Sequence, residues 1–91
     1  MASTKTWNGI TPELFACVKS RSDREHGTKY EPANANQGTA TTSVRAVGTI
    51  VLGFDLQSGG ALTYTIQKKP FVVPESRIWD GIDETIKGCR K

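Results

Sequence analysis

The chain has 91 residues, a hydrophobic content of 36% and a formal net charge of +3, which predicts a single small domain with a modest core. It contains no uninterrupted apolar stretch of the roughly 18 residues that a membrane helix needs, and no apolar run of a secretory leader follows its first residues. We therefore expect a cytoplasmic protein without a membrane partner. The small positive charge is typical of a solvated surface and does not by itself indicate nucleic-acid binding.

The first clear element is a short helix that follows a polar N-terminal segment. Thr11 suits the N-cap position and Pro12 the first turn of a helix. The polar pattern predicts that the helix extends to about Glu25, with His26 in its last turn and Gly27 directly after it. The apolar side chains that this helix presents to a core are Leu14, Phe15 and Val18.

Strand signals on either side of this helix are weaker. Residues 1–10 predict an edge strand or an ordered arm held by Trp7, and residues 29–31 predict a short strand. The region 32–42 has no charged and no large apolar side chain, which predicts a mobile loop. A weak threonine and valine alternation over 39–47 predicts a strand that leads into the next element.

Residues 47–67 predict a β-hairpin, because apolar residues alternate in both arms and a glycine-rich turn separates them. The apolar sets of the two arms share one face only if the turn has three residues, Ser58, Gly59 and Gly60. Such a turn needs a glycine at positive φ and a bulge. The resulting register pairs Leu56 with Leu62, Phe54 with Tyr64, and Leu52 with Ile66.

The C-terminal helix is predicted by isoleucines at every fourth position. Residues 68–74, which precede it, contain two prolines and are expected to form a connector or an edge strand. We expect Gly81 to allow a close approach to the sheet, Gly88 to end the helix, and Ile82→Asp to unfold the domain. The apolar stripe comprises Ile78, Ile82 and Ile86, with Trp79 beside it.

These elements predict an α+β fold, with residues 1–91 in one domain. The expected sheet is antiparallel, has three to four strands and is built on the central hairpin. Its apolar face needs a cover, which the C-terminal amphipathic helix and the short N-terminal helix would supply.

The two cysteines, Cys17 and Cys89, fall in the two predicted helices. Two cysteines do not make a disulfide framework, so we expect reduced thiols, with a single bridge between the helices as the alternative. Because His26 is the one histidine, the ligand set of a zinc site is missing. We expect no metal and no cofactor, and the lack of a nucleophile with a neighbouring base disfavours an enzyme.

The leading functional hypothesis is a non-enzymatic protein-binding or regulatory or inhibitory module, whose partner is another protein or a second copy of the chain. Its expected interaction surface comprises Trp7, Lys68, Lys69, Phe71, Val72 and Val73. The first alternative is a nucleic-acid-binding domain with a basic patch. That patch would comprise Lys68, Lys69, Arg77, Lys87, Arg90 and Lys91. The second alternative is a ligand-binding or enzymatic domain, which requires a pocket between sheet and helix that Tyr64, Asp55 or His26 faces.

Overall fold

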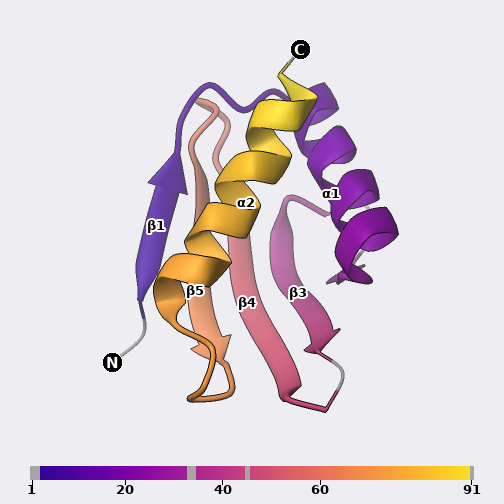
Figure 1. Ribbon diagram of the computed structural model, residues 1–91. Helices are drawn as coiled ribbons and strands as arrows, with labels where there is room; N and C mark the ends of the chain where they lie inside the picture. The colour runs from indigo at the N-terminus through magenta and orange to yellow at the C-terminus, as the bar shows by residue number, and fades with distance from the viewer. Residues whose placement is uncertain (1–2, 33–34, 45, 91) are drawn as a thin grey trace.

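The computed structural model describes residues 3–32, 35–44 and 46–90, and it has two helices on one face of an antiparallel sheet (Figure 1). The sheet has five strands in the order β1-β5-β4-β3-β2. The elements are β1 Thr4–Trp7, α1 Pro12–His26, β2 Lys29–Glu31, β3 Gln37–Val44, β4 Gly48–Leu56, β5 Leu62–Lys68 and α2 Glu75–Cys89. The predicted α+β class is confirmed, whereas the predicted three to four strands become five because short strands pair at both edges.

The central hairpin of β4 and β5 has the predicted register. Leu56 pairs with Leu62, Phe54 with Tyr64, and Leu52 with Ile66. The amide of Gln57 donates to the carbonyl of Ala61 at 2.8 Å, which closes a three-residue turn. Gly60 in that turn has φ +90°, a conformation that glycine adopts without a steric penalty.

Strand β3 replaces most of the predicted loop at 32–42. It pairs with β4 along its whole length, from Gln37 opposite Asp55 to Val44 opposite Gly48. Its inward side chains are small, and Ala40 is only 1% exposed. The strand predicted over 39–47 corresponds to this element, which begins earlier, at Gln37, and ends at Val44. Small and threonine side chains form no conspicuous apolar alternation, so the pattern did not show where the strand begins. Residues 33 and 34 of the predicted loop lie outside the described residues.

Helix α1 has the predicted limits. The Thr11 side chain accepts a hydrogen bond from the Leu14 amide at 3.0 Å, which satisfies one of the free amides of the first turn. Gly27 follows the helix with φ +70°, and its amide donates to the carbonyl of Asp23 at 2.9 Å. This left-handed residue ends the helix in the manner expected of a C′ glycine.

Helix α2 buries only part of its isoleucine stripe. Ile78 and Ile86 are buried, whereas Ile82 is half-buried. The expected close approach at Gly81 is wrong, since no described atom outside its chain neighbours and the backbone of its own helix lies within 4 Å of the position that a Cβ would take there. The helix also continues one residue past Gly88, to Cys89.

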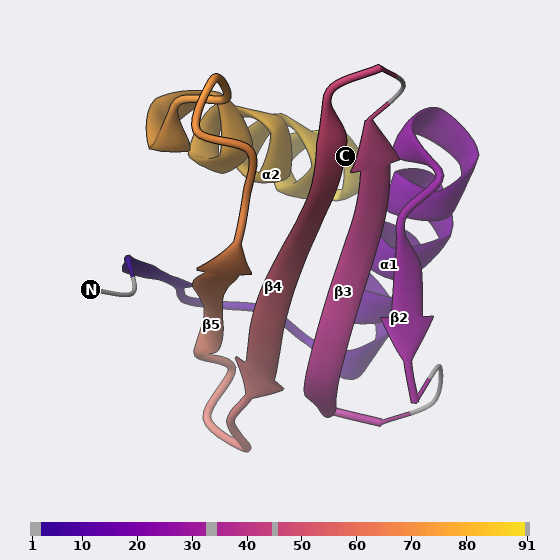
Figure 2. The ribbon, with the colours of Figure 1, turned by 90° about the horizontal axis from the view of Figure 1, so that it is seen from below.

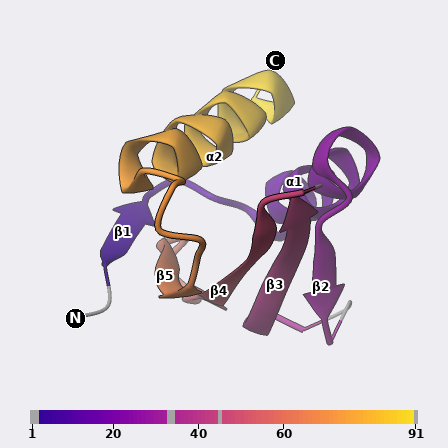
Figure 3. The same ribbon diagram turned by 60° about the horizontal axis from the view of Figure 1, so that its bottom comes forward.

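A disulfide joins Cys17 of α1 to Cys89 of α2, with the two Cα atoms 5.9 Å apart. The expectation of reduced thiols is therefore wrong, because the second turn of α1 packs beside the last turn of α2. We call this the closed end of the helix pair. Away from it the helices diverge, so that α2 lies over β1 and β5 while α1 lies over β2 and β3 (Figures 2 and 3). The opposite end is the open end.

One core lies between the sheet and the two helices. Tyr64 is at its centre, and the ring of Trp7 packs edge-on against the Tyr64 ring with centroids 5.9 Å apart. The buried hydrophobic residues are Trp7, Ile10, Phe15, Val18, Ala40, Leu52, Phe54, Leu56, Leu62, Tyr64, Ile66, Ile78 and Ile86.

Candidate functional site

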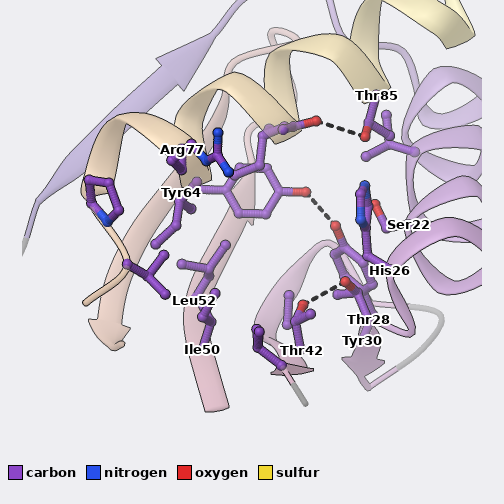
Figure 4. A pocket seen from close by; sticks show the side chains of 18 of the residues that line it. Ser22, His26, Thr28, Tyr30, Thr42, Ile50, Leu52, Tyr64, Arg77 and Thr85 are labelled. Carbon is purple, nitrogen blue, oxygen red and sulfur yellow. Dashed lines mark hydrogen bonds between the residues drawn. The ribbon is translucent and has the colours of Figure 1, made fainter. Parts of the chain in front are cut away.

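A groove of about 390 Å³ lies between the two helices, over the middle of the sheet (Figure 4). Its floor comes from β3, β4 and β5, namely Ala40, Thr42, Val44, Ile50, Leu52 and Tyr64. The wall on α1 comprises Val18, Ser22 and His26, and the wall on α2 comprises Arg77, Ile78, Gly81, Ile82 and Thr85. Thr28, Tyr30 and residues 72–74 complete the lining. Small side chains on all three sides leave this volume unfilled.

Two tyrosines on the sheet form a hydrogen-bonded pair beside the groove. The hydroxyls of Tyr30 and Tyr64 lie 2.6 Å apart, and Tyr30 is also hydrogen-bonded to the Ser22 hydroxyl. Burial raises the pKa of Tyr30 and raises that of Tyr64 well above the ordinary value near 10. Both phenols are therefore neutral at physiological pH and keep their protons for hydrogen bonding.

The other polar side chains of the groove also bond to one another. The hydroxyls of Thr28 and Thr42 lie 2.6 Å apart, and the Thr85 hydroxyl donates to the carbonyl of Gly81 at 2.8 Å. Within the described residues, every buried side-chain nitrogen or oxygen has a partner. The interior of the groove therefore offers apolar surface and few free hydrogen-bonding groups.

Charge in the groove is confined to its open end. Arg77 in the first turn of α2 and His26 at the end of α1 are both exposed, and both line the groove. No aspartate or glutamate is among the described residues of the lining. Among the described lining residues, the mouth of the groove therefore carries a guanidinium from α2, an imidazole from α1 and no carboxylate.

The connector between β5 and α2 forms one lip of this mouth. Val72 and Val73 line the groove, while the Phe71 side chain is 92% exposed and that of Val72 61%. The start of β4 packs against the connector, since a Cβ atom on Gly48 would lie 3.0 Å from Pro70 Cγ. Apolar side chains are thus exposed beside the opening of the groove.

The residues of the predicted interaction surface do not all lie together. Lys68 ends β5, and Lys69, Phe71, Val72 and Val73 belong to the connector between β5 and α2. Trp7 does not belong to this surface, because only 9% of it is exposed. Its indole nitrogen instead donates to the Asp83 carboxylate on α2 at 3.3 Å.

The predicted nucleic-acid patch is divided between the two ends of α2. Arg77 lies in the first turn, near the connector that carries Lys68 and Lys69. Lys87, ten residues further on, pairs with Asp83 at 2.9 Å, and Arg90 donates to the carbonyl of Asn8 at 2.6 Å. Ten residues of helix span about 15 Å. Lys91, the remaining member of the predicted patch, lies outside the described residues.

Candidates for metal or catalytic chemistry do not converge. In the part of the chain that the structure describes, no three potential His, Cys, Asp or Glu ligands gather at one point, and both cysteines are in the disulfide. Asp55 lies on the sheet face away from the helices and bonds to Gln57 at 2.7 Å. Neither described helix has the length and apolar content to cross a bilayer.

Comparison with protein-family models, curated proteins and solved structures finds no match for this chain. Of the residues that the second alternative required to face a cavity, Tyr64 and His26 do so and Asp55 does not. The sequence pattern did not identify Ser22, Thr42 and Thr85 as groove residues. The sequence feature that could have indicated them is a small polar residue at an inward-facing position of a helix or strand.

Proposed function

We propose that this protein binds a small, mainly apolar molecule in the groove between α1 and α2. The observation that carries the proposal is the groove itself, whose volume of about 390 Å³ lies within the usual range of small-molecule sites. Its lining is largely aliphatic and aromatic, with a few polar groups at defined places, as in most such sites.

The incomplete burial of apolar residues supports this proposal. A domain of 91 residues gains stability from each apolar side chain that it buries, at about 25 cal/mol per Å². Ile50, Ile82 and Val44 nevertheless remain half-buried along the groove. A bound apolar molecule would cover these side chains and recover that stabilisation.

Binding without catalysis is the form of this function that the side chains favour. Ser22, which stands one turn before His26 on α1, is hydrogen-bonded to Tyr30. The described lining also has no carboxylate and no thiol, since both cysteines are bridged. A nucleophile activated by a base, the usual requirement of covalent catalysis, is therefore not assembled there.

A substitution at Gly81 tests the proposal. Gly81 lines the groove and has open space where a side chain would begin, so Gly81→Leu should fill the groove without displacing the backbone. Gly81→Ala is the matched control, because it also replaces the helix-destabilising glycine and adds only a methyl group. Both variants should be more stable than the wild type by up to about 1 kcal/mol.

The measurement is a titration with the uncharged apolar fluorescent dye N-phenyl-1-naphthylamine, with a thermal melt of each variant as the control for folding. We expect the wild type and Gly81→Ala to bind the dye and Gly81→Leu to lose at least tenfold in affinity. Equal binding by all three proteins, or no binding by the wild type, would contradict the proposal.

A second candidate function is self-association, which the 92% exposure of Phe71 favours. Phe71 and the groove mouth lie at the same end of the molecule, so the Phe71 of each copy could enter the groove of the other in a two-fold contact. Sedimentation velocity over a range of concentrations tests this candidate. The wild type should form dimers that Phe71→Ser abolishes and Gly81→Leu weakens, whereas monomers at all concentrations would rule it out.

A further inference from the structure

We infer that the ligand of the groove is an amphipathic anion, with an apolar body between the helices and a carboxylate at the mouth beside Arg77 and His26. This inference rests on the proposed function and adds the chemical class of the ligand. It is based on two observations: the basic side chains of the groove lie at its mouth, and the hydroxyls of its interior are already hydrogen-bonded.

The arginine and the histidine of the lining come from opposite walls of the open end. Arg77 belongs to α2 and His26 to α1, and Figure 4 shows them on either side of the Tyr64 ring. A guanidinium binds a carboxylate through two parallel hydrogen bonds, and an imidazole nitrogen can donate a third. A headgroup between the two helices would therefore be held from both sides.

The negative charges nearest to this mouth do not occupy it. Glu75 and Asp80 stand on α2 on either side of Arg77 in the sequence, and Glu25 precedes His26 on α1. None of these three carboxylates lines the groove. A ligand carboxylate would thus meet Arg77 and His26 without a like charge in the lining.

The interior of the groove excludes the opposite orientation. The hydroxyls of Tyr30 and Tyr64 bond to each other, and the Thr85 hydroxyl bonds to the backbone of its own helix. A charged group placed in the interior would lose its hydration and find only groups that already have partners. The apolar part of the ligand therefore belongs inside and the charged part at the mouth.

The decisive experiment compares two ligands that differ only in the headgroup, dodecanoate and dodecanol, each below its aggregation concentration. Isothermal titration calorimetry should show that dodecanoate binds the wild type about tenfold more tightly, a difference typical of a charge-assisted hydrogen bond. Arg77→Gln should lose about that tenfold for dodecanoate and leave dodecanol unchanged. His26→Gln should show a smaller loss in the same direction.

Lys68→Gln is the matched control, because it removes one positive charge at the same end of the molecule from a residue that does not line the groove. It should leave the affinity for both ligands within twofold of the wild type. Equal losses in Lys68→Gln and Arg77→Gln would mean that the charge acts through the general field of the surface, and would overturn the assigned headgroup position.

The remaining outcomes separate this inference from the proposed function. If dodecanol binds as tightly as dodecanoate and Arg77→Gln changes neither affinity, the ligand is not an anion. The proposal that the groove binds an apolar molecule is then unaffected. If neither ligand binds, but the dye binds the wild type and not Gly81→Leu, the ligand is not an aliphatic carboxylate. The proposal that the groove binds an apolar molecule then still holds. If dye and both ligands all fail to bind, the proposed function itself is wrong.

Discussion

The two ends of the helix pair have opposite properties. At the closed end a disulfide joins Cys17 and Cys89, and Phe15 and Ile86 are almost fully buried. At the open end Ile82 is half-buried, and the exposed side chains of Arg77 and His26 border the groove. The closed end can thus supply the stability of the helix layer, which leaves the open end free to keep apolar surface uncovered.

The largest expected effect concerns the disulfide at the closed end. Cys17 and Cys89 are 72 residues apart in the sequence, and a bridge that closes so long a loop removes much of the entropy of the unfolded chain. The double variant Cys17→Ser, Cys89→Ser should therefore lose roughly 4 kcal/mol of unfolding free energy. Urea denaturation with and without a thiol reductant measures this loss.

The reductant provides the internal control, because it should destabilise the wild type and leave the double variant unchanged. Cys17 is exposed, so the bridge is accessible to the reagent. If the wild type unfolds at the same urea concentration in both conditions, the closed end does not depend on this bond and the comparison between the two ends fails.

A pair of isoleucines one helical turn apart tests the difference in burial. Ile86 is 1% exposed, so Ile86→Ala should cost about 3 kcal/mol, as expected when a large buried side chain is truncated. Ile82 already borders an open groove, and Ile82→Ala should cost about 1 kcal/mol. Thermal and urea unfolding of both variants give the two values.

This pair also revises the expectation that Ile82→Asp unfolds the domain. Since Ile82 is half-buried, Ile86→Asp should be the more damaging of the two substitutions. Equal costs at the two positions would mean that the groove closes over Ile82 in solution.

The smallest expected effect concerns the tyrosine pair beside the groove. Tyr64→Phe removes one partner of the hydrogen bond with Tyr30 and should cost about 1 kcal/mol at neutral pH. Tyr30 keeps its bond to Ser22, which limits the loss. Urea denaturation at pH 7 measures the difference.

The same variant has a predictable pH dependence. Burial raises the pKa of Tyr64 in the folded protein, so above pH about 10 the unfolded chain releases a proton that the folded chain retains. The stabilisation from this group is present below that pH and decreases as the pH rises toward the folded pKa. Unfolding free energies between pH 9 and 11 should fall more steeply for the wild type than for Tyr64→Phe. Parallel curves would show that the hydroxyl is not buried as described.

Local sequence signals were sufficient for the hairpin and for helix α1. The β4–β5 register follows from the alternation of apolar residues, because a shift by one residue would turn Phe54 or Tyr64 to the opposite face. The Thr11 side chain accepts a hydrogen bond from an amide at the start of α1, and the left-handed Gly27 donates its amide to carbonyls at the end of the helix. These two residues therefore set the limits of α1. Both depend on contacts between residues close in the chain.

The full number of strands, the disulfide and the groove required the tertiary structure. Strands β1 and β2 are short and join the sheet only through their pairing with β5 and β3. Cys17 and Cys89 meet only because two helices that are distant in the sequence pack side by side.

The groove depends on the divergence of those helices over Ala40, Thr42 and Leu52. A sequence pattern shows which face of an element is apolar. The angle between two elements, and hence the volume between them, is set by the packing of many side chains at once.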